Sequence, residues 1–389
     1  MIKVGFTLIG GNNWTGGYNY LINLFRAIST HEANRITPVL FVGRDININD
    51  VEVFSSISGV EVIRSPLFNR KRRYLSLFET LLLGRSTAVT DLLNKNHVDI
   101  VFEAAQFFGW RLGIPALAWI PDFQHKYLRH MFSISAYWKR DLGFRAQIIG
   151  GRHIMLSSED ARNDCEKFYP ASIGKTHVVR FAVSSASRIS TKDAREIADS
   201  YNLPKYFFIL PNQFWKHKNH TVVINALNFL KKRGESVVVA VPGKQFDPRD
   251  PGYFSQIQTR VIELGLENEF RLLGLIPYNH LLALISASAA LINPSKFEGW
   301  STTVEEAKAL GVPMILSDLR VHIEQAGNNA TYFNTDSPTQ LADLLLKQIS
   351  CPPTDSACSR HVIRPDLVKQ YAMSFADLAF EISRSANPA

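Results

Sequence analysis

The sequence predicts an α/β protein of two domains, each built on a parallel sheet. Short apolar runs with the length of strands alternate with helical segments along most of the chain, which is the pattern of a parallel sheet covered by helices. The 389 residues are enough for two such domains, each with its own core. Several predicted strands lead directly into glycine-rich or polar loops, which is where open α/β sheets place their ligands.

The first predicted domain covers residues 1–183. It begins with a strand, a glycine-rich loop and a helix, and it ends at a polar stretch, Val183 to Lys205, that has the composition of a linker with a short helix. Its predicted strands are Ile2–Ile9, Pro38–Val42, Val60–Ile63, Val98–Phe102, Ile114–Ile120, His153–Ser158 and His177–Ala182, and its predicted helices are Tyr18–Ile28, Asn69–Arg85 and Glu159–Tyr169.

The second predicted domain covers residues 184–366 and repeats the alternation of strands and helices. Its predicted strands are Tyr206–Leu210, Ser236–Val241, Phe270–Leu273, Ala289–Pro294, Val312–Ser317 and Ala330–Phe333. Its predicted helices are Tyr278–Ser286, a helix that passes through Ala307 and Leu310, and Thr339–Gln348.

The bulk composition narrows the class of partner. The net charge of +8 indicates an anionic partner, and a nucleotide, a nucleic acid and an anionic lipid all fit this description. A nucleic acid is disfavoured because the chain has no basic stripe with interleaved aromatic residues. The amino terminus has the pattern of a strand followed by glycine rather than of a signal peptide, and no apolar run reaches the length of a membrane span.

The cysteine content favours a reducing setting. Cys165, Cys351 and Cys358 show no pairing pattern, and no pair of histidines accompanies them to complete a zinc site. We therefore expect a cytoplasmic protein, with peripheral attachment to the inner face of a membrane left open.

Two acids in the second half mark the central stretch of the chain. Glu298 follows the apolar run Ala289 to Pro294, so it stands near the carboxyl end of a predicted strand. Glu306 comes eight positions later, about two turns into the next helix. Gly299 permits a sharp turn between them. The nearby helix amino terminus directs its free N–H groups to the same place, which suits a phosphorylated, hydroxyl-rich ligand.

The start of that helix carries several possible caps. Thr302 and Glu305 have the spacing of a capping box. The residues that offer a side-chain cap are Ser301, Thr302 and Thr303.

Two loops of the first domain also follow predicted strands. The sequence GGNNWTGG, residues 10–17, is either a phosphate-approach loop or a simple tight turn, because it matches neither G-x-G-x-x-G nor a Walker loop. The sequence PDFQH, residues 121–125, lies where sheets of this class place ligands, but it also fits a loop with a partly buried histidine.

The helix predicted at Asn69 to Arg85 combines a basic start with an apolar face. Two interpretations stay open. It is either an ordinary helix packed on the sheet, or a helix that rests on an anionic membrane and gives access to a lipid-linked acceptor. The apolar face is formed by Tyr74, Leu75, Phe78, Leu81 and Leu82.

The central stretch, SKFEGWSTTVEEAKALGVP, resembles the signature of retaining glycosyltransferases of the GT-B fold, in family 4 (glycosyl transferases group 1). The Phe-Glu-Gly pattern and a second Glu eight residues later match, whereas Trp300 to Thr303 depart from the usual turn. The resemblance implies two Rossmann-like domains that face each other across a cleft. The first is on the acceptor side and the second binds the nucleotide-sugar donor. A last helix, at about residues 367–389, is expected to cross back to the first domain.

The resemblance implies site residues in the first domain. His125 matches a histidine that reaches the transferred sugar, and Asp122 matches an acid that supports its loop. Gly16 and Gly17 match a glycine pair that approaches the phosphate of the donor.

The loop PNQFWKHKNH, residues 211–220, matches the phosphate-binding loop of the family. Lys218 stands at the position of a lysine that holds the diphosphate and stabilises the leaving group. The arginine that usually accompanies it is replaced by Gln213, which is a departure, and a lysine cannot reproduce the two-pronged geometry of arginine. Either lysine of the loop also fits a solvated helix start. The residues that could supply the missing charge are Lys216, His217, Arg180 and Arg271.

The remaining implied contacts surround the donor. Glu306 suits the ribose hydroxyls, because a carboxylate accepts two hydrogen bonds from a diol, and Glu298 would hold hydroxyls of the donor sugar. Gly243 lies in a turn that faces the donor, and Leu275 lies in a loop that contacts the base through its backbone. The turn between the two acids completes the set with Gly299, Trp300, Ser301 and Thr302.

The implied reaction moves mannose or a similar hexose from a nucleoside diphosphate to a hydroxyl group of a glycan or lipid-linked acceptor, in the synthesis of a surface polysaccharide or lipopolysaccharide. GDP-mannose is the leading donor, with UDP-linked and dTDP-linked sugars next. Retention is expected by same-face attack, with no metal and no cofactor. Two alternatives remain: a non-catalytic nucleotide-sugar-binding subunit, which Gln213 would explain, and a nucleotide-sugar epimerase.

Overall fold

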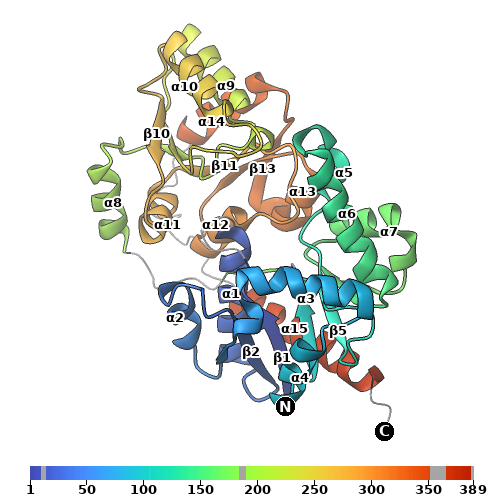
Figure 1. The fold of residues 1–389 in the computed structure, drawn as a ribbon. Helices are drawn as coiled ribbons and strands as arrows, with labels where there is room; N and C mark the ends of the chain where they lie inside the picture. Colours follow the sequence, from blue (N-terminus) through green and yellow to red (C-terminus); the bar gives the residue numbers. More distant parts are fainter. Residues whose placement is uncertain (10–14, 105, 184–189, 351–364, 387–389) are drawn as a thin grey trace. The chain divides into compact units, whose positions relative to one another are not determined.

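The computed structural model describes residues 1–9, 15–104, 106–183, 190–350 and 365–386. The chain forms two compact units (Figure 1). Unit 1 comprises Met1–Ser184 together with Pro365–Ala389, and unit 2 comprises Ser185–Arg364. Cys351 and Cys358 lie outside the described residues, and Cys165 is a buried free thiol in unit 1.

Unit 1 is built on a seven-stranded sheet in the order β3-β2-β1-β4-β5-β6-β7, and every neighbouring pair is parallel. The order reverses between β1 and β4, as in Rossmann folds. The strands are β1 (Ile2–Thr7), β2 (Ile36–Val42), β3 (Glu61–Arg64), β4 (Ile100–Glu103), β5 (Ala116–Trp119), β6 (His153–Leu156) and β7 (Thr176–Val178). The helices are α1 (Thr15–His31), α2 (Asn49–Ser55), α3 (Arg70–Leu83), α4 (Thr87–Lys95), α5 (Gln124–Tyr127), α6 (Ile134–Ile149), α7 (Glu159–Phe168) and α15 (Pro365–Ala386).

Unit 2 repeats this arrangement with a six-stranded parallel sheet in the order β10-β9-β8-β11-β12-β13. Here the order reverses between β8 and β11. The strands are β8 (Phe208–Ile209), β9 (Val239–Pro242), β10 (Phe270–Gly274), β11 (Ala290–Asn293), β12 (Met314–Ser317) and β13 (Ala330–Phe333). The helices are α8 (Thr191–Ser200), α9 (His220–Lys232), α10 (Tyr253–Glu263), α11 (Tyr278–Ala287), α12 (Thr302–Leu310), α13 (Arg320–Ala326) and α14 (Pro338–Ser350).

The four inner strands of unit 2, β8, β9, β11 and β12, are buried on both faces, which explains their largely continuous apolar sequences. Successive residues of a strand point to opposite faces of the sheet. Phe208 accordingly packs in one core cluster and Ile209 in the other, and the same alternation separates Ile292 from Leu291. The two-domain α/β fold predicted from the sequence is confirmed.

The last helix, α15, packs into unit 1. Phe375 is buried with its ring 6.1 Å from that of Phe6 on β1 and 6.0 Å from that of Phe102 on β4. Arg35 donates to Asp377 at 2.7 Å near the same helix. The carboxyl-terminal helix thus completes the core of the unit that the amino-terminal strand begins.

One local prediction needs correction, and one helix of unit 1 has an unexpected inward face. The capping box between Thr302 and Glu305 is wrong, because Ser301 occupies the cap position of α12 and no side-chain cap bond forms. The Glu305 carboxylate instead accepts from Lys308 at 2.8 Å and Gln325 at 2.9 Å. The sequence analysis makes no prediction for α6, which buries the polar side chains of Asp141 and Gln147 together with Ile148. An apolar period therefore does not mark its inward face.

Candidate functional site

The candidate site of unit 2 lies where the strand order reverses. β8 and β11 pair directly, with Phe208 opposite Ala290 and Ile209 opposite Leu291. Because the two strands are parallel, the loops that follow them leave from the same edge of the sheet. In open α/β sheets the connections on either side of such a point run in opposite directions, and ligands bind beyond the carboxyl ends of the strands there. The two loops that follow these strands, which carry most of the predicted loop 211–220 and the start of the central stretch 295–313, meet there.

An ion pair joins the two loops. The Lys218 Nζ atom is 2.6 Å from Glu298 Oε1, and both side chains are almost entirely buried. Lys218 ends a short 3-10 helix, Lys216–Lys218, and Asn219 turns the chain in the left-handed region with φ of 56° before α9 begins. The structure therefore brings together two predicted residues that lie 80 positions apart.

The surroundings of this pair fix its charge. Burial alone would raise the pKa of Glu298, but the positive charges of Lys218 and His322 and the bonds from Lys218 and Ser295 outweigh it and hold the pKa at about 2. Glu298 is therefore ionised at neutral pH. His217 behaves differently, because burial and the neighbouring Lys218 lower its pKa to about 3. A neutral His217 cannot replace the charge that Gln213 lacks.

Asn293, the last residue of β11, is the hub of this network and was missed by the sequence analysis. Its amide nitrogen lies 3.4 Å from Glu298 Oε1 and 3.0 Å from Ser301 Oγ. Its amide oxygen accepts from Asn212 at 3.2 Å and from Ser295 Oγ at 2.7 Å. The signal that could have found it is a polar residue at the carboxyl end of an otherwise apolar strand.

Glu306 is the second predicted acid, and its surroundings are opposite in character. It is buried on α12, where its Oε1 accepts from the Tyr278 hydroxyl at 3.0 Å. Its Oε2 has no hydrogen-bond partner among the described residues. Burial raises the pKa of Glu306 to about 7, although the bond from Tyr278 works against it. A buried carboxylate oxygen without a partner is uncommon in folded proteins, and a bound proton or a hydrogen-bond donor from a ligand would satisfy it.

The loops after β8, β9 and β10 pack on one another. A side chain at Gly243 would meet the Asn212 carbonyl oxygen at 2.2 Å and the Gln213 Cα at 3.3 Å, so only glycine fits this approach. The Gly243 amide also donates to Gly274 at 2.8 Å, and Leu275 is exposed just beyond it. Three predicted residues, Gln213, Gly243 and Leu275, are thus neighbours along this edge.

A guanidinium lies beside the lysine loop, and the sequence analysis did not find it. Arg249 stacks over the Trp215 ring, 4.9 Å from its centroid, and is held by the buried Asp247 through two bonds of 2.9 and 3.0 Å. Lys216 is exposed and lies 3.9 Å from Asp250. Arg271, by contrast, donates to the carbonyls of Asn268 and Asn202.

The turn from Gly299 to Thr302 is held by α13. The Gln325 side chain accepts from the Ser301 amide at 3.1 Å and donates to the Ser301 carbonyl at 2.7 Å. Trp300 is half-buried and hydrogen-bonds to the side chain of Glu305. Thr302 is the first residue of α12. The fixed start of α12 sets the position of Glu306 one turn further along.

Unit 1 carries the other predicted residues at the ends of β1 and β5. Gly16 and Gly17 lie in the first turn of α1, which begins at Thr15 rather than Tyr18. Asp122 accepts from the Gln124 amide at 2.8 Å and from Arg140 at 2.7 Å, so it holds the turn after β5. The part of the predicted glycine-rich loop at residues 10–14 lies outside the described residues.

His125 is fully buried inside unit 1. Its Nε2 is 3.1 Å from the Tyr169 hydroxyl and 3.7 Å from Asp141 Oδ1. Its Nδ1 is buried without a hydrogen-bond partner among the residues that the structure describes. Burial, with the charges of Arg140 and Lys126, lowers its pKa to about 4, so the ring is neutral. In this arrangement His125 contacts protein groups.

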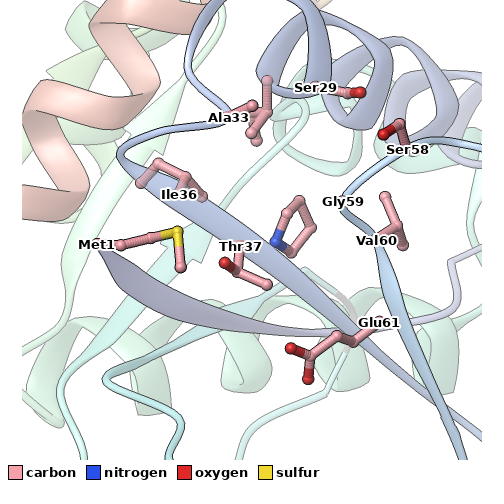
Figure 2. A pocket seen from close by; sticks show the side chains of 11 residues that line it. Met1, Ser29, Ala33, Ile36, Thr37, Ser58, Gly59, Val60 and Glu61 are labelled. Atoms are coloured by element: carbon pink, nitrogen blue, oxygen red, sulfur yellow. The ribbon is translucent and has the colours of Figure 1, made fainter.

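Unit 1 has a cavity of about 340 Å³ at the amino-terminal ends of β2 and β3, away from the carboxyl ends that carry the predicted site residues (Figure 2). It is lined by the beginnings of β2 and β3 and the end of α1, including Ile36, Glu61 and Ser29, and it contains no predicted site residue. Across the described ranges, no group of three or more His, Cys, Asp or Glu residues is placed to hold a metal ion. None of the described helices is long and apolar enough to cross a membrane.

Known proteins resemble this chain in sequence and in fold. Residues 193–363, nearly all of unit 2, match the family model described as glycosyl transferases group 1. The O-antigen chain mannosyltransferase RfbU of Salmonella typhimurium is 25% identical over 216 residues, which cover 55% of this chain and 56% of that protein. The chain thus matches about half the length of this curated relative.

Solved structures share the whole fold. A glycosyltransferase from Rickettsia africae has a TM-score of 0.72 at 15% identity, covering 100% of this chain and 99% of that one. Anabaena Alr3699/HepE in complex with UDP and glucose has a TM-score of 0.65 at 14% identity, covering 99% and 98%. WaaG, a glycosyltransferase involved in lipopolysaccharide biosynthesis, has a TM-score of 0.59 at 15% identity, covering 99% and 100%.

These findings define the class of protein. The two parallel sheets have the architecture of the GT-B glycosyltransferases. Most of unit 2 matches the family model of glycosyl transferases group 1, and the Lys218–Glu298 pair and Glu306 all lie inside the matched segment. The family match and the shared fold support a transferase enzyme.

Proposed function

We propose that this protein is a retaining glycosyltransferase of family 4 that moves a hexose from a nucleoside-diphosphate sugar to a hydroxyl of a glycan or lipid-linked acceptor. The observation that carries the proposal is the pair of acids, Glu298 and Glu306, next to the point where the strand order of unit 2 reverses. Glu298 is bound to a buried lysine, and Glu306 offers a buried oxygen that no described group satisfies.

Glu306 would hold the nucleoside part of the donor. Its unpartnered Oε2 is buried, and Tyr278 already binds its Oε1. A ribose diol brings two hydroxyl donors to this carboxylate, which accepts them best when ionised. The exposed loop at Leu275, next to Tyr278 in sequence, would contact the base.

Lys218 would hold the diphosphate, and Glu298 would hold hydroxyls of the sugar. The main barrier in sugar transfer is cleavage of the anomeric C–O bond, during which negative charge grows on the leaving phosphate. A fixed cation next to that phosphate lowers the barrier because the charge it meets is larger in the transition state. Lys216 at the start of the same turn adds a second positive charge.

Arg249 is our candidate for the charge that Gln213 does not supply. Its guanidinium is fixed between Trp215 and Asp247, beside the loop that carries Lys218. We expect Arg249→Ala to weaken binding of a nucleoside diphosphate about 10-fold or more, the usual loss for a charged hydrogen bond. Arg260→Ala is the matched control, since Arg260 is an exposed arginine of α10 paired with Glu263. Equal affinity in both variants would remove Arg249 from the site.

The chemistry we propose is same-face transfer. The acceptor hydroxyl attacks the anomeric carbon on the side from which the phosphate leaves. A new C–O bond forms as the old one breaks, and the proton of the hydroxyl passes to an oxygen of the leaving diphosphate. The anomeric configuration is retained. Glu298, ionised and tied to Lys218, would orient the sugar rather than form a covalent bond to it.

The donor base and sugar are taken from the relatives. The similarity to an O-antigen mannosyltransferase supports mannose, and therefore GDP-mannose, and a role in surface polysaccharide synthesis. The likeness to a structure holding UDP and glucose makes UDP-glucose the next candidate. Sugars linked to dTDP are the donor candidates after these two.

A thermal-shift panel of GDP, UDP, dTDP and ADP, with and without magnesium, tests the proposal. A ligand that binds only the folded protein raises its melting temperature. We expect one diphosphate to give a clear rise that does not need magnesium and that Glu306→Ala removes. The sugar nucleotide of that base is then assayed for transfer. A flat panel for all four would contradict the donor site.

A further inference from the structure

Helix α3 presents its apolar face outward. Its buried side chains are the small polar ones of Ser76 and Thr80, each 3% exposed, whereas Tyr74 is 74% and Phe78 is 62% exposed. A surface helix of a globular protein normally buries its apolar stripe. The interpretation of α3 as an ordinary helix with its apolar face packed on the sheet is therefore wrong. Figure 1 shows the helix along the outside of unit 1.

The outward side chains form one continuous stripe. Lys71, Tyr74, Phe78 and Leu82 follow one another at intervals of three or four residues, so they share a helix face. Tyr74, Phe78 and Leu82 are all exposed. The stripe therefore has a basic residue at its amino-terminal end and large apolar residues along the rest.

The end of α3 is held by two glycines. Gly84 ends the helix in the left-handed region with φ of 81°, and its carbonyl accepts from the Arg111 amide at 2.9 Å. A side chain at Gly109 would meet that same carbonyl oxygen at 2.0 Å, so the two chains can approach this closely only without one. The approach places the exposed Trp110 beside Gly84, where it extends the apolar surface.

The segment is strongly basic. Residues 70–85 contain five basic side chains and one acid, Glu79, which gives a formal charge of 5 − 1 = +4. Glu79 is engaged by Arg72 at 3.2 Å and by Ser86 at 2.6 Å. Arg70, Lys71 and Arg85 are exposed, so their charge is available to a partner.

We propose that α3 lies in the headgroup region of an anionic lipid bilayer, with its apolar face directed into the acyl boundary and its basic residues against the lipid phosphates. The helix has 14 residues, too few for the roughly 20 that cross a bilayer, so it would lie along the surface. A second copy of the chain suits this face less well, because pairing would bring two segments of charge +4 together. This inference goes beyond the proposed transfer reaction and does not depend on it.

Vesicle flotation tests the proposal. The full-length protein is mixed at low salt with vesicles of phosphatidylcholine alone or of phosphatidylcholine with phosphatidylglycerol. We expect flotation with the mixed vesicles, little with the neutral ones, and release when the salt concentration is raised, because the attraction to anionic lipid is screened.

Two double variants separate the apolar and the charged contributions. Phe78→Gln with Leu82→Gln removes two apolar side chains, and partitioning is expected to fall about 100-fold. Arg70→Gln with Lys71→Gln removes two charges, and a fall of about 30-fold is expected. Glutamine is a good helix former, so α3 is kept. Ile173→Gln with Ile262→Gln is the matched control, because both isoleucines are exposed but lie outside α3.

Three results would overturn the proposal. The first is that the wild type does not float with anionic vesicles at low salt. The second is that the Phe78→Gln, Leu82→Gln variant floats as well as the wild type. The third is that light scattering shows a wild-type dimer which this variant converts to a monomer. The nucleotide thermal shift of each variant is measured in parallel. If the protein floats but no nucleotide shifts its melting temperature, the membrane proposal stands and the proposed function fails. If a nucleotide shifts the melting temperature but the protein does not float, the proposed function stands and the membrane proposal fails.

Discussion

At the residue scale, two glutamates of one short stretch have opposite electrostatic surroundings. Lys218 and neighbouring hydrogen bonds hold the pKa of Glu298 at about 2, whereas burial with only the Tyr278 hydroxyl as partner raises that of Glu306 to about 7. The difference comes from a cation 2.6 Å from one carboxylate and from an unsatisfied oxygen on the other. Glu298 is therefore a fixed anion, whereas Glu306 keeps one carboxylate oxygen without a hydrogen-bond partner among the described residues.

We expect Glu306→Gln to stabilise the protein above pH 7 while it weakens donor binding. The folded-state pKa of Glu306 is about 7 against an ordinary value of 4.5, so between these values the folded state holds a proton that the unfolded state has lost. Wild-type stability therefore falls as pH rises through this window, by up to about 3 kcal/mol. Urea unfolding of both proteins at pH 5 and pH 8 measures the difference.

The same variant separates function from structure. Nucleotide binding by the wild type should tighten as pH rises through about 7, because the ionised carboxylate accepts from the ribose hydroxyls, and Glu306→Gln should lose that pH dependence. Identical pH profiles of binding for both proteins would place Glu306 outside the site.

Glu298→Gln tests the anionic partner of Lys218. Glutamine keeps the size of the side chain but removes the charge, so we expect turnover to fall by about 10- to 100-fold. Stability should also fall, because Lys218 is left as an almost fully buried charge without its counter-ion. Lys218→Met in the Glu298→Gln background removes that charge and should restore stability without restoring turnover. Full activity of Glu298→Gln would show that the sugar is held elsewhere.

At the scale of the element, loops at the carboxyl ends of strands carry the predicted residues, and the neighbouring helices fix them. Gln325 on α13 clamps the start of α12, and Tyr278 on α11 reaches Glu306. In unit 1, α5, α6 and α7 meet around Asp141. Its carboxylate accepts from Lys126, Arg145 and Tyr169, and the net effect of these bonds is to lower its pKa despite burial.

His125 is fully buried because of where α5 packs, so its role depends on that helix more than on its place in the sequence. We expect His125→Phe, which fills the aromatic surroundings but cannot hydrogen-bond, to leave the protein folded and to cut transfer about 10-fold or more. Tyr169→Phe is the matched variant, since it removes the same hydrogen bond from the other side and leaves His125 in place. If both variants lose the same small amount of transfer activity, in proportion to their loss of melting temperature, His125 has a structural role only.

At the scale of the whole molecule, the first six strands of unit 1 and the six strands of unit 2 follow the same order. Most of the predicted site residues follow strands at or next to the point where that order reverses, whereas Leu275 follows the edge strand β10. The chain carries a net charge of +8, and its cations near the candidate site, Lys216, Lys218 and Arg249, lie in unit 2. A diphosphate would be neutralised there by side chains.

We therefore expect transfer to continue in excess chelator. Side-chain cations that hold the leaving phosphate make a divalent ion unnecessary for that step. The measurement is the transfer rate with and without the chelator, with a metal-dependent transferase assayed in parallel to show that the chelator is effective. Loss of activity that a divalent ion restores would contradict this prediction.

The sequence by itself determined the alternation of strands and helices, the two-domain α/β class and the position of the two acids. These features are local: buried parallel strands need continuous apolar runs, and Glu298 and Glu306 are placed by the strand and helix between which they stand. The departure at Gln213 was also readable, because it is a matter of residue identity.

Only the tertiary structure decided which groups meet. Asn293 became the hub because β8 and β11 are neighbours, and Arg249 came beside Trp215 through a loop fold that no spacing encodes. The outward apolar face of α3 and the complete burial of His125 were equally hidden, since a period of 3.6 residues shows that a face exists but not what it contacts. Burial and pairing depend on residues far apart in the chain, so pKa values, unsatisfied oxygens and exposed faces appear only once the chain has folded.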